Sequence, residues 1–441
     1  MCDNLYDMID ISSFESKESF CSHMEIIRAL VEAGANIQHP NHFGGTCLIN
    51  SVQSPELVEY LIKNGADVNA EDVQHKTALH YAVQEHRLET TKVLLEHGAD
   101  IFKRSKYGDD ALQTSCVKGA LMIFNHLIEI GAFPIKRICD AFELMGASFL
   151  LETHDMSSSL FLWRKAIELR NGREGERIEK PRMGKHPVLD AEEFSTEAEL
   201  EAMFMDMNLM KVQALFITER VLGSLHKDTI FRYMYAGAAH ADTNEYKQCI
   251  LLWNYALGLK IKKETLLSSD TSFTLRAVIQ LFINILLKEH GKDDLQFCDV
   301  INTTKFINDG LEHSIALLKI NPQYKSQADT FDLILHSWLH LVFLLLSLAR
   351  DYDERREIYH LVRHMKEINP RTQNNNSVLH LAVSVNSPVT SNSFLDDESI
   401  EIFPNRDVVN FLLECGHSVI VRNTAWETPL HVATKKVKHL F

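Results

Sequence analysis

Gly65-Ala66-Asp67 and Gly98-Ala99-Asp100 mark the stretch that decides the fold, which runs from Thr46 to Gly131. The same pattern occurs once before them, as Gly34-Ala35-Asn36, and once after them, in the weaker form Gly131-Ala132-Phe133. The spacings between successive copies are 31, 33 and 33 residues. A second marker keeps the same period: Thr46-Cys47-Leu48, Thr77-Ala78-Leu79-His80 and Asp110-Ala111-Leu112. Two independent markers with one period indicate a chain built from repeated units.

A period near 33 residues with these markers is typical of ankyrin repeats, in which a turn precedes two antiparallel helices. We expect inner helices near 47–54, 78–86 and 111–118, and outer helices near 57–63, 89–97 and 121–130. Polar finger-like turns lie between repeats, at 39–44, 71–76 and 104–109. Because one unit cannot bury its apolar face alone, the units stack and form a concave surface, which suits binding rather than chemistry.

The remaining sequence predicts an all-α fold: an ankyrin-repeat solenoid, a central helical tetratricopeptide-like domain and a second short ankyrin block. The expected segments are an irregular N-terminus 1–20, ankyrin repeats 21–134, a helical cap 135–170, an exposed linker 171–190, the tetratricopeptide-like domain 191–370 and C-terminal ankyrin repeats 371–441. Small residues such as Ala238 opposite large ones such as Trp253 suggest the tetratricopeptide-type hairpin, and an irregular helical bundle is the alternative. The ankyrin marker returns at Ser377–Ala382 and Thr428–Ala433, 51 residues apart, which leaves room for an insertion near 387–399.

Composition limits the function classes. Lys and Arg number 45 and Asp and Glu 60, so the net charge is −15, which disfavours nucleic acid as a partner. Eight scattered cysteines without a Cys-x-x-Cys pair suit a reducing compartment, and we expect a cytoplasmic protein, with the nucleus as the other compartment. We find no secretory signal, and the longest apolar stretch, Trp338–Ala349, is shorter than a membrane span, so we expect no membrane partner.

No motif predicts catalysis or a cofactor. Phosphate-binding loops, nucleophile elbows and zinc helices are absent from the sequence, so we expect no enzyme, no metal and no cofactor. His336 and His340 stand four residues apart and could share a metal, but two partly buried core histidines are the favoured interpretation. His80, His380 and His431 occupy the ankyrin Thr-Pro-Leu-His position, where the imidazole joins neighbouring turns.

Partner contacts are expected on the fingers and on exposed inner-helix positions, which line the concave face of a solenoid. The predicted contact residues are Asn41, His42, Phe43, Gln74, His75, Tyr81, Arg104, Lys106, Tyr107 and Asp109. Phe43, Tyr81 and Tyr107 are candidate aromatic anchors. The alternative is that these are solvated turn residues without a partner.

A second pattern lies within the repeats. Residues 111–120 have the Ala-Leu-x-x-x-Cys-x-x-x-Ala spacing of an elongin-binding box, with Leu112 and Cys116 on one helix face. The same segment is an ankyrin inner helix, in which both side chains should face a neighbouring repeat. The structural interpretation is favoured, because burial in a packed stack would hide the box.

The order of ankyrin stack, helical middle and second ankyrin block resembles the Fem (feminization-one homologue) family from about residue 21 onward. The segments that carry the resemblance are Arg137-Ile138, Glu143–Phe149, Glu219–Gly223, Tyr235–Asp242, Glu245–Trp253 and Asn369–Thr372. The family consists of substrate receptors of cullin–RING ubiquitin ligases, whose ankyrin groove holds C-terminal degrons, often ending in Arg, and whose C-terminal elongin box docks the ligase.

The resemblance therefore implies a non-catalytic adaptor that recruits target proteins or C-terminal degrons, with elongins B and C and a cullin as partners. The sequence departs from the family at both ends. About three further repeats usually precede the start of this chain, and a family aspartate would fall near Cys21. The chain also stops before the usual elongin box, so that we expect a shortened receptor. An ankyrin scaffold or decoy that binds a protein without recruiting a ligase is the alternative.

Overall fold

The computed structural model describes residues 14–172, 177–181, 184, 186–287, 294–320, 325–384 and 402–435. Over these ranges the chain is helical and contains no strand, which confirms the all-α prediction. It divides into two compact units, Met1–Leu222 and Gly223–Phe441, which are described separately. This division lies inside the tetratricopeptide-like domain predicted for 191–370.

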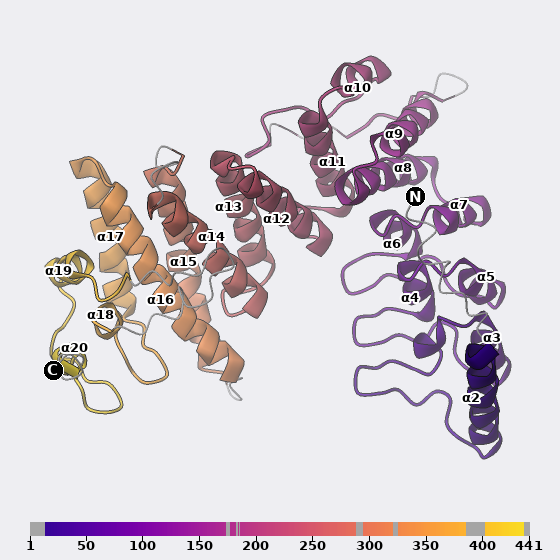
Figure 1. The fold of residues 1–441 in the computed structure, drawn as a ribbon, viewed down its shortest axis with the longest axis horizontal. Coiled ribbons are helices and arrows are strands. Elements are labelled where there is room, and N and C mark those ends of the chain that lie inside the picture. Colours follow the sequence, from indigo (N-terminus) through magenta and orange to yellow (C-terminus); the bar gives the residue numbers. More distant parts are fainter. Residues whose placement is uncertain are drawn as a thin grey trace. The chain divides into compact units, whose positions relative to one another are not determined.

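The first unit begins with stacked ankyrin repeats, whose finger turns project on the same side of the helices (Figure 1). Inner elements are η1 (Ile49–Ser51), α4 (Ala78–Gln84) and α6 (Ala111–Val117), and outer helices are α2 (Phe14–Glu32), α3 (Pro55–Lys63), α5 (Leu88–Glu96) and α7 (Leu121–Ile130). The Gly-Ala-Asp marker ends outer helices because its glycine adopts a left-handed conformation, with φ +95° at Gly65 and +86° at Gly98.

Two expectations for the start of the chain were wrong in detail. Residues 14–20, predicted to be irregular, belong to α2, and no glycine or proline interrupts the sequence between Phe14 and Glu32. The first inner helix, expected over 47–54, is only the 3-10 turn η1. The Ser51 hydroxyl at the end of this turn donates to the Cys47 carbonyl at 2.5 Å. The next helix, α3, already begins at Pro55, which leaves no room for a longer inner helix.

Neighbouring repeats are joined through the histidine of the second marker, as predicted. His80 Nδ1 accepts from the Thr77 N–H at 3.1 Å, and Nε2 lies 3.1 Å from the Asp109 carbonyl in the next finger. Burial lowers the pKa of His80, so the ring stays neutral and can donate through Nε2. The bond therefore fixes the start of α4 and the position of the following finger together.

Helices α8 (Ile135–Ser148) and α9 (Met156–Asn171), joined by the π-helical turn η2 (Phe149–Thr153), follow the repeats where a helical cap was expected. They pack closely because Gly146 has no side chain: a Cβ there would lie 2.5 Å from the Trp163 ring nitrogen. That nitrogen instead donates to the Glu143 carbonyl at 2.9 Å.

The segment 171–190, predicted to be an exposed linker, is in part buried. His186 and Leu189 are buried, and the side chain of Lys180 is only 8% exposed. His186 Nε2 lies 3.0 Å from Glu219 Oε2, and the ammonium of Lys180 lies 4.0 Å from the centroid of the Phe194 ring. The sequence prediction failed because charge and a lack of periodicity suggested solvent, whereas these charges have partners elsewhere in the unit.

A buried ion network joins this segment to α8, α9 and α11 (Met207–Leu222); the short helix α10 (Glu197–Met203) precedes α11. The charges of its three carboxylates and three cations sum to zero. The carboxylates are Asp140, Glu143 and Glu193, and the cations are Arg170, Lys180 and Arg220. Arg170 Nε lies 3.0 Å from Glu143 Oε1, and Arg220 Nη1 lies 2.8 Å from Asp140 Oδ1. These pairs place α11 in the first unit.

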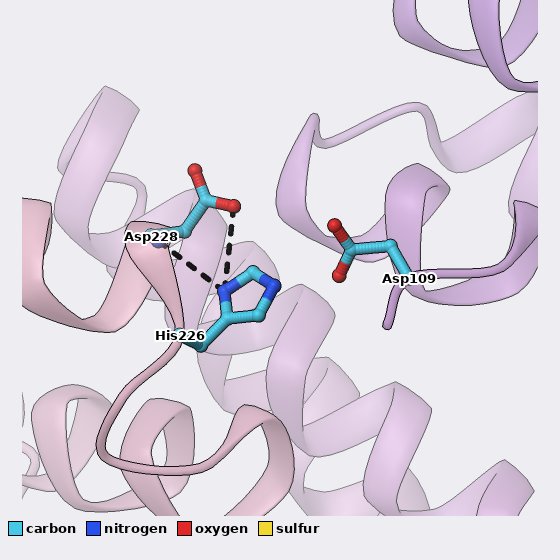
Figure 2. A group of neighbouring side chains, drawn as sticks. All are labelled: Asp109, His226 and Asp228. Carbon is cyan, nitrogen blue, oxygen red and sulfur yellow. Dashed lines mark hydrogen bonds and ion pairs between the residues drawn. The ribbon is translucent and has the colours of Figure 1, made fainter. Parts of the chain in front are cut away.

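The second unit is a series of antiparallel helices (Figure 1): α12 (Lys227–Asp242), α13 (Tyr246–Lys263), α14 (Ser269–Leu287), α15 (Phe297–Leu318), α16 (Lys325–Leu348) and α17 (Tyr352–Ile368). His226 caps α12, since its Nδ1 accepts from the Asp228 N–H at 3.2 Å (Figure 2). Helices α12 and α13 form the expected hairpin, in which a Cβ at Gly237 would lie 2.3 Å from the Trp253 ring.

Helix α16 passes through the core of the second unit. By length and composition alone, Ser269–Leu287 and Ser326–Leu348 could each cross a membrane, but 56% and 61% of these windows are buried within the fold. His340 Nδ1 donates to the His336 carbonyl at 2.8 Å, and its ring packs against Phe403. Burial lowers the pKa of both histidines to about 4, as expected of core residues.

The second ankyrin block comprises α18 (Val378–Ala382), α19 (Arg406–Glu414) and α20 (Pro429–Lys435). His380 repeats the role of His80, with Nδ1 accepting from the Ser377 N–H at 3.2 Å and Nε2 lying 2.9 Å from the Glu427 carbonyl. His431 makes the corresponding contact to the Thr428 N–H at 3.3 Å. The expected insertion at 387–399 lies outside the described residues.

Candidate protein-binding surface

The fingers of the first unit are linked to one another by main-chain hydrogen bonds. The Val73 N–H donates to the Phe43 carbonyl at 3.1 Å, and the Lys106 N–H donates to the Gln74 carbonyl at 2.7 Å. Each finger is also closed internally, as by the bond of 2.7 Å from the Ser105 N–H to the Asp109 carbonyl. A partner would therefore meet a surface that is already ordered, which lowers the entropy cost of binding.

In the first finger, Asn41 has a structural role and its neighbours are exposed. Asn41 Oδ1 accepts from the N–H groups of Phe43 and Gly45, both at 2.9 Å. Phe43 is 71% exposed, and its ring contacts His42 edge to face at 5.4 Å between centroids. Because the turn holds the Phe43 ring in solvent, this side chain is the aromatic anchor that the surface offers most openly.

In the second finger, Asp72 takes the place of Asn41 and also fixes Tyr81 on α4. Asp72 Oδ1 accepts from the Gln74 N–H at 2.8 Å, and the Tyr81 hydroxyl donates to Oδ2 at 2.6 Å. Burial, and then the Asp72 carboxylate, raise the pKa of Tyr81 to about 12. Tyr81 is thus held as a neutral donor to its own finger, and its side chain is half-buried.

Lys76 also lies on this surface, although the repeat pattern did not predict it as a contact residue. Its ammonium lies 5.2 Å from the centroid of the Tyr81 ring and donates to Gln84 Oε1 at 3.0 Å. The exposed His75 lies beside it, with φ +55° and its ring 2.9 Å from Glu71. Spacing alone could have indicated Lys76, because it is the last residue of the predicted turn 71–76, but its contact with the ring depends on where the Tyr81 side chain points.

The third finger separates the predicted residues into two groups. Arg104 and Lys106 are exposed, and Tyr107 is half-buried, with its N–H donating to Ser105 Oγ at 3.2 Å. Asp109 is buried, and its carbonyl accepts the bond from His80 described above. The main chain of Asp109 therefore builds the finger, whereas Arg104 and Lys106 face solvent.

Arg137, which is not among the predicted contact residues, follows the last ankyrin repeat and belongs to α8. It forms an ion pair with Asp110, whose other oxygen caps α6 by accepting from the Gln113 N–H at 3.0 Å. Arg137 also borders a cavity of about 90 Å³ between α6, α8 and α11. Cys116 and Leu144 contribute apolar surface to the same cavity.

Leu112 and Cys116, the residues of the elongin-box pattern, are buried inside the stack. Their exposures are 1% and 0%, and Cys116 Sγ lies 3.4 Å from the Ala141 carbonyl of α8. Helix α6 packs between α4 and α8. A docking protein could reach this face only if α8 separated from α6.

Comparison with known proteins places these features in a family. A family model described as ankyrin repeats (3 copies) matches residues 19–105. The chain is 32% identical to Protein fem-1 homolog A of Danio rerio over 344 residues, 75% of this chain and 53% of that protein. It is 32% identical to Protein fem-1 homolog C of Homo sapiens over 355 residues, 78% of this chain and 55% of that protein.

A longer match, of 28% identity over 449 residues, is to Protein fem-1 homolog A-like of Mus musculus, and it covers 92% of this chain and 67% of that protein. The chain thus spans about half to two thirds of the length of these relatives. Ankyrin repeats bind other proteins, which indicates that this chain takes part in protein–protein interactions. The repeats and the matches over most of the chain together show that it belongs to the Fem family of ankyrin-repeat proteins.

Proposed function

We propose that this protein is a non-catalytic substrate-recognition adaptor of a cullin–RING ubiquitin ligase, which binds target proteins or degrons through its ankyrin fingers. The observation that carries the proposal is the similarity to fem-1 homologues over 75% to 92% of the chain. The fingers support it, since they are ordered by main-chain bonds and expose Phe43, Arg104 and Lys106. The role in a ubiquitin ligase is proposed from the family resemblance.

The proposal places the protein in the cytoplasm or nucleus. The cysteines of the described ranges are all free thiols, which suits a reducing compartment. Burial raises the pKa of Cys139 and Cys415 to about 11, which keeps them as inert thiols at neutral pH. These two groups therefore fill core positions.

Target binding through the fingers is tested by affinity capture with wild-type protein and two matched variants. Phe43→Ala removes the exposed ring of the first finger, and Phe161→Ala removes a ring on α9 that is 68% exposed. We expect the same proteins to be captured by wild type and Phe161→Ala and to be lost with Phe43→Ala. Equal capture by all three proteins would remove the fingers from target recognition.

Ligase recruitment is tested separately, by co-purification of the full chain with elongins B and C and a cullin. A stable complex is expected, and Cys116→Ala shows whether α6 takes part in it. Since Leu112 and Cys116 are buried, we expect this variant to retain the complex through another surface. If no complex forms and circular dichroism shows that the chain is helical, ligase recruitment is excluded. The second candidate function, an ankyrin scaffold or decoy, would then remain.

A further inference from the structure

The third finger carries a cluster of positive charge in a chain whose net charge is −15. Three of the four residues 103–106 are basic: Lys103, Arg104 and Lys106. The guanidinium of Arg137 adds a fourth cation to this end of the stack. Its pKa is lowered by burial and by the charge of Arg104, so these two cations act on each other.

Two of these cations are already neutralised. Lys103 forms an ion pair with Glu71 of the preceding finger, and Arg137 forms one with Asp110. Within the described ranges, the side chains of Arg104 and Lys106 form no ion pair or side-chain hydrogen bond. The finger therefore presents two exposed charges that lack an anion, beside a third cation whose partner is buried.

The cluster is held in a fixed position. The Lys106 N–H donates to the Gln74 carbonyl at 2.7 Å, and the Gly108 N–H donates to the Ser105 carbonyl at 2.8 Å. The Arg137 guanidinium lies 5.4 Å from the centroid of the Phe133 ring. Because the backbone is ordered, an incoming carboxylate meets neighbouring cations whose mutual repulsion it relieves, and little conformational entropy is lost.

We propose that the third finger, through Arg104 and Lys106 with Arg137 beside them, binds an acidic peptide segment of the target protein. The proposal rests on the proposed function in that the fingers hold a protein target, and it names the chemistry of that target. A nucleic acid fits less well, since its affinity depends on many phosphate contacts.

The test is selection from a displayed pool of random twelve-residue peptides on the full-length protein. The same selection is done with Arg104→Glu/Lys106→Glu and with a control, Lys118→Glu/Lys319→Glu. The control reverses the same number of charges at two exposed lysines that do not belong to the third finger. Selected peptides are then measured by fluorescence anisotropy at low and high salt, with each Glu and Asp also replaced by Gln and Asn.

We expect wild type and control to enrich acidic peptides, and Arg104→Glu/Lys106→Glu to lose this preference. Affinity for the acidic peptides should fall about fivefold or more in that variant, in the Gln and Asn versions, and at high salt. Enrichment of neutral or basic peptides, or of none, would overturn the proposal. So would equal losses in the control variant, or tighter binding of an RNA oligonucleotide through the same two residues. If the capture of targets depends on Phe43 but not on Arg104 and Lys106, the proposed function is supported and only this inference is refuted.

Discussion

Replacing Glu143 by glutamine should destabilise the first unit more than any exposed charge change. The Glu143 side chain is 1% exposed and lies against three cations: Arg170, Lys180 and Arg220. Glutamine has nearly the same shape but no charge. The variant would bury three cations against two remaining carboxylates, so that one positive charge is left uncompensated.

The expected loss is about 3–5 kcal/mol, the range for breaking a buried ion pair from one side. For a unit of this size, a loss of 1 kcal/mol in the free energy of unfolding lowers Tm by about 2–4 °C, so the Tm of the first unit should fall by roughly 6–20 °C. The matched control is Glu201→Gln, which removes one of the two carboxylates paired with Arg164 on the surface, where Glu201 is 58% exposed. For this control variant we expect a loss of stability of no more than about 1 kcal/mol.

Hydrogen exchange measured by mass spectrometry distinguishes the two units. Peptides from α8 should exchange roughly 100-fold or more faster in Glu143→Gln, while peptides from α16 should be unchanged. Adding Arg220→Gln restores charge balance, so the double variant should recover part of the loss. A change below about 1 kcal/mol in Glu143→Gln would refute the reasoning.

The same network predicts a pH dependence. Burial alone would raise the pKa of Glu143, but Lys180, Arg220 and Arg170 outweigh it, and the pKa is lowered. A carboxyl group whose pKa is depressed on folding stabilises above its unfolded pKa, and this contribution is lost as the pH falls through the folded value. The stability difference between wild type and Glu143→Gln should therefore shrink in acid.

Three further changes test other contacts. Gly146→Ala forces a Cβ against Trp163 and should cost about 1–3 kcal/mol in urea unfolding, and a change within 0.5 kcal/mol of zero would contradict the close α8–α9 packing. Tyr81→Phe removes the hydrogen bond to Asp72 and should cost about 1 kcal/mol, with faster exchange of the second finger; unchanged exchange would mean that the bond does not order it. Since burial lowers the pKa of His340 to about 4, this residue should contribute about 2 kcal/mol to the stability that the second unit loses between pH 7 and pH 5, as the unfolded imidazole gains a proton that the folded one does not; His336 and His417, whose pKa values are also about 4, add to this loss. His340→Gln should make that profile shallower, and an equally steep profile in the variant would assign the pH dependence to other groups.

The sequence alone predicted the repeats because their signals are local. The two repeat markers act over a few residues: the glycine at Gly65 ends an outer helix with φ +95°, and Thr77 begins the inner helix that the second marker predicted. The finger positions followed from the same period. Their function as a surface also depends on the bonds between fingers, such as the one from Lys106 to Gln74, which no local pattern specifies.

The tertiary structure decided which charged and polar residues are free to bind a partner. Lys103 and Arg104 are neighbours in sequence, yet one is paired with the preceding finger and the other is not. Asp140 and Arg220 lie 80 residues apart and meet in a buried network, whereas their sequence context suggested an amphipathic helix and the start of another domain. Local periodicity determines helices and turns because it acts within a few residues. Ion pairing and burial depend on which distant elements pack together, and this only the folded chain determines.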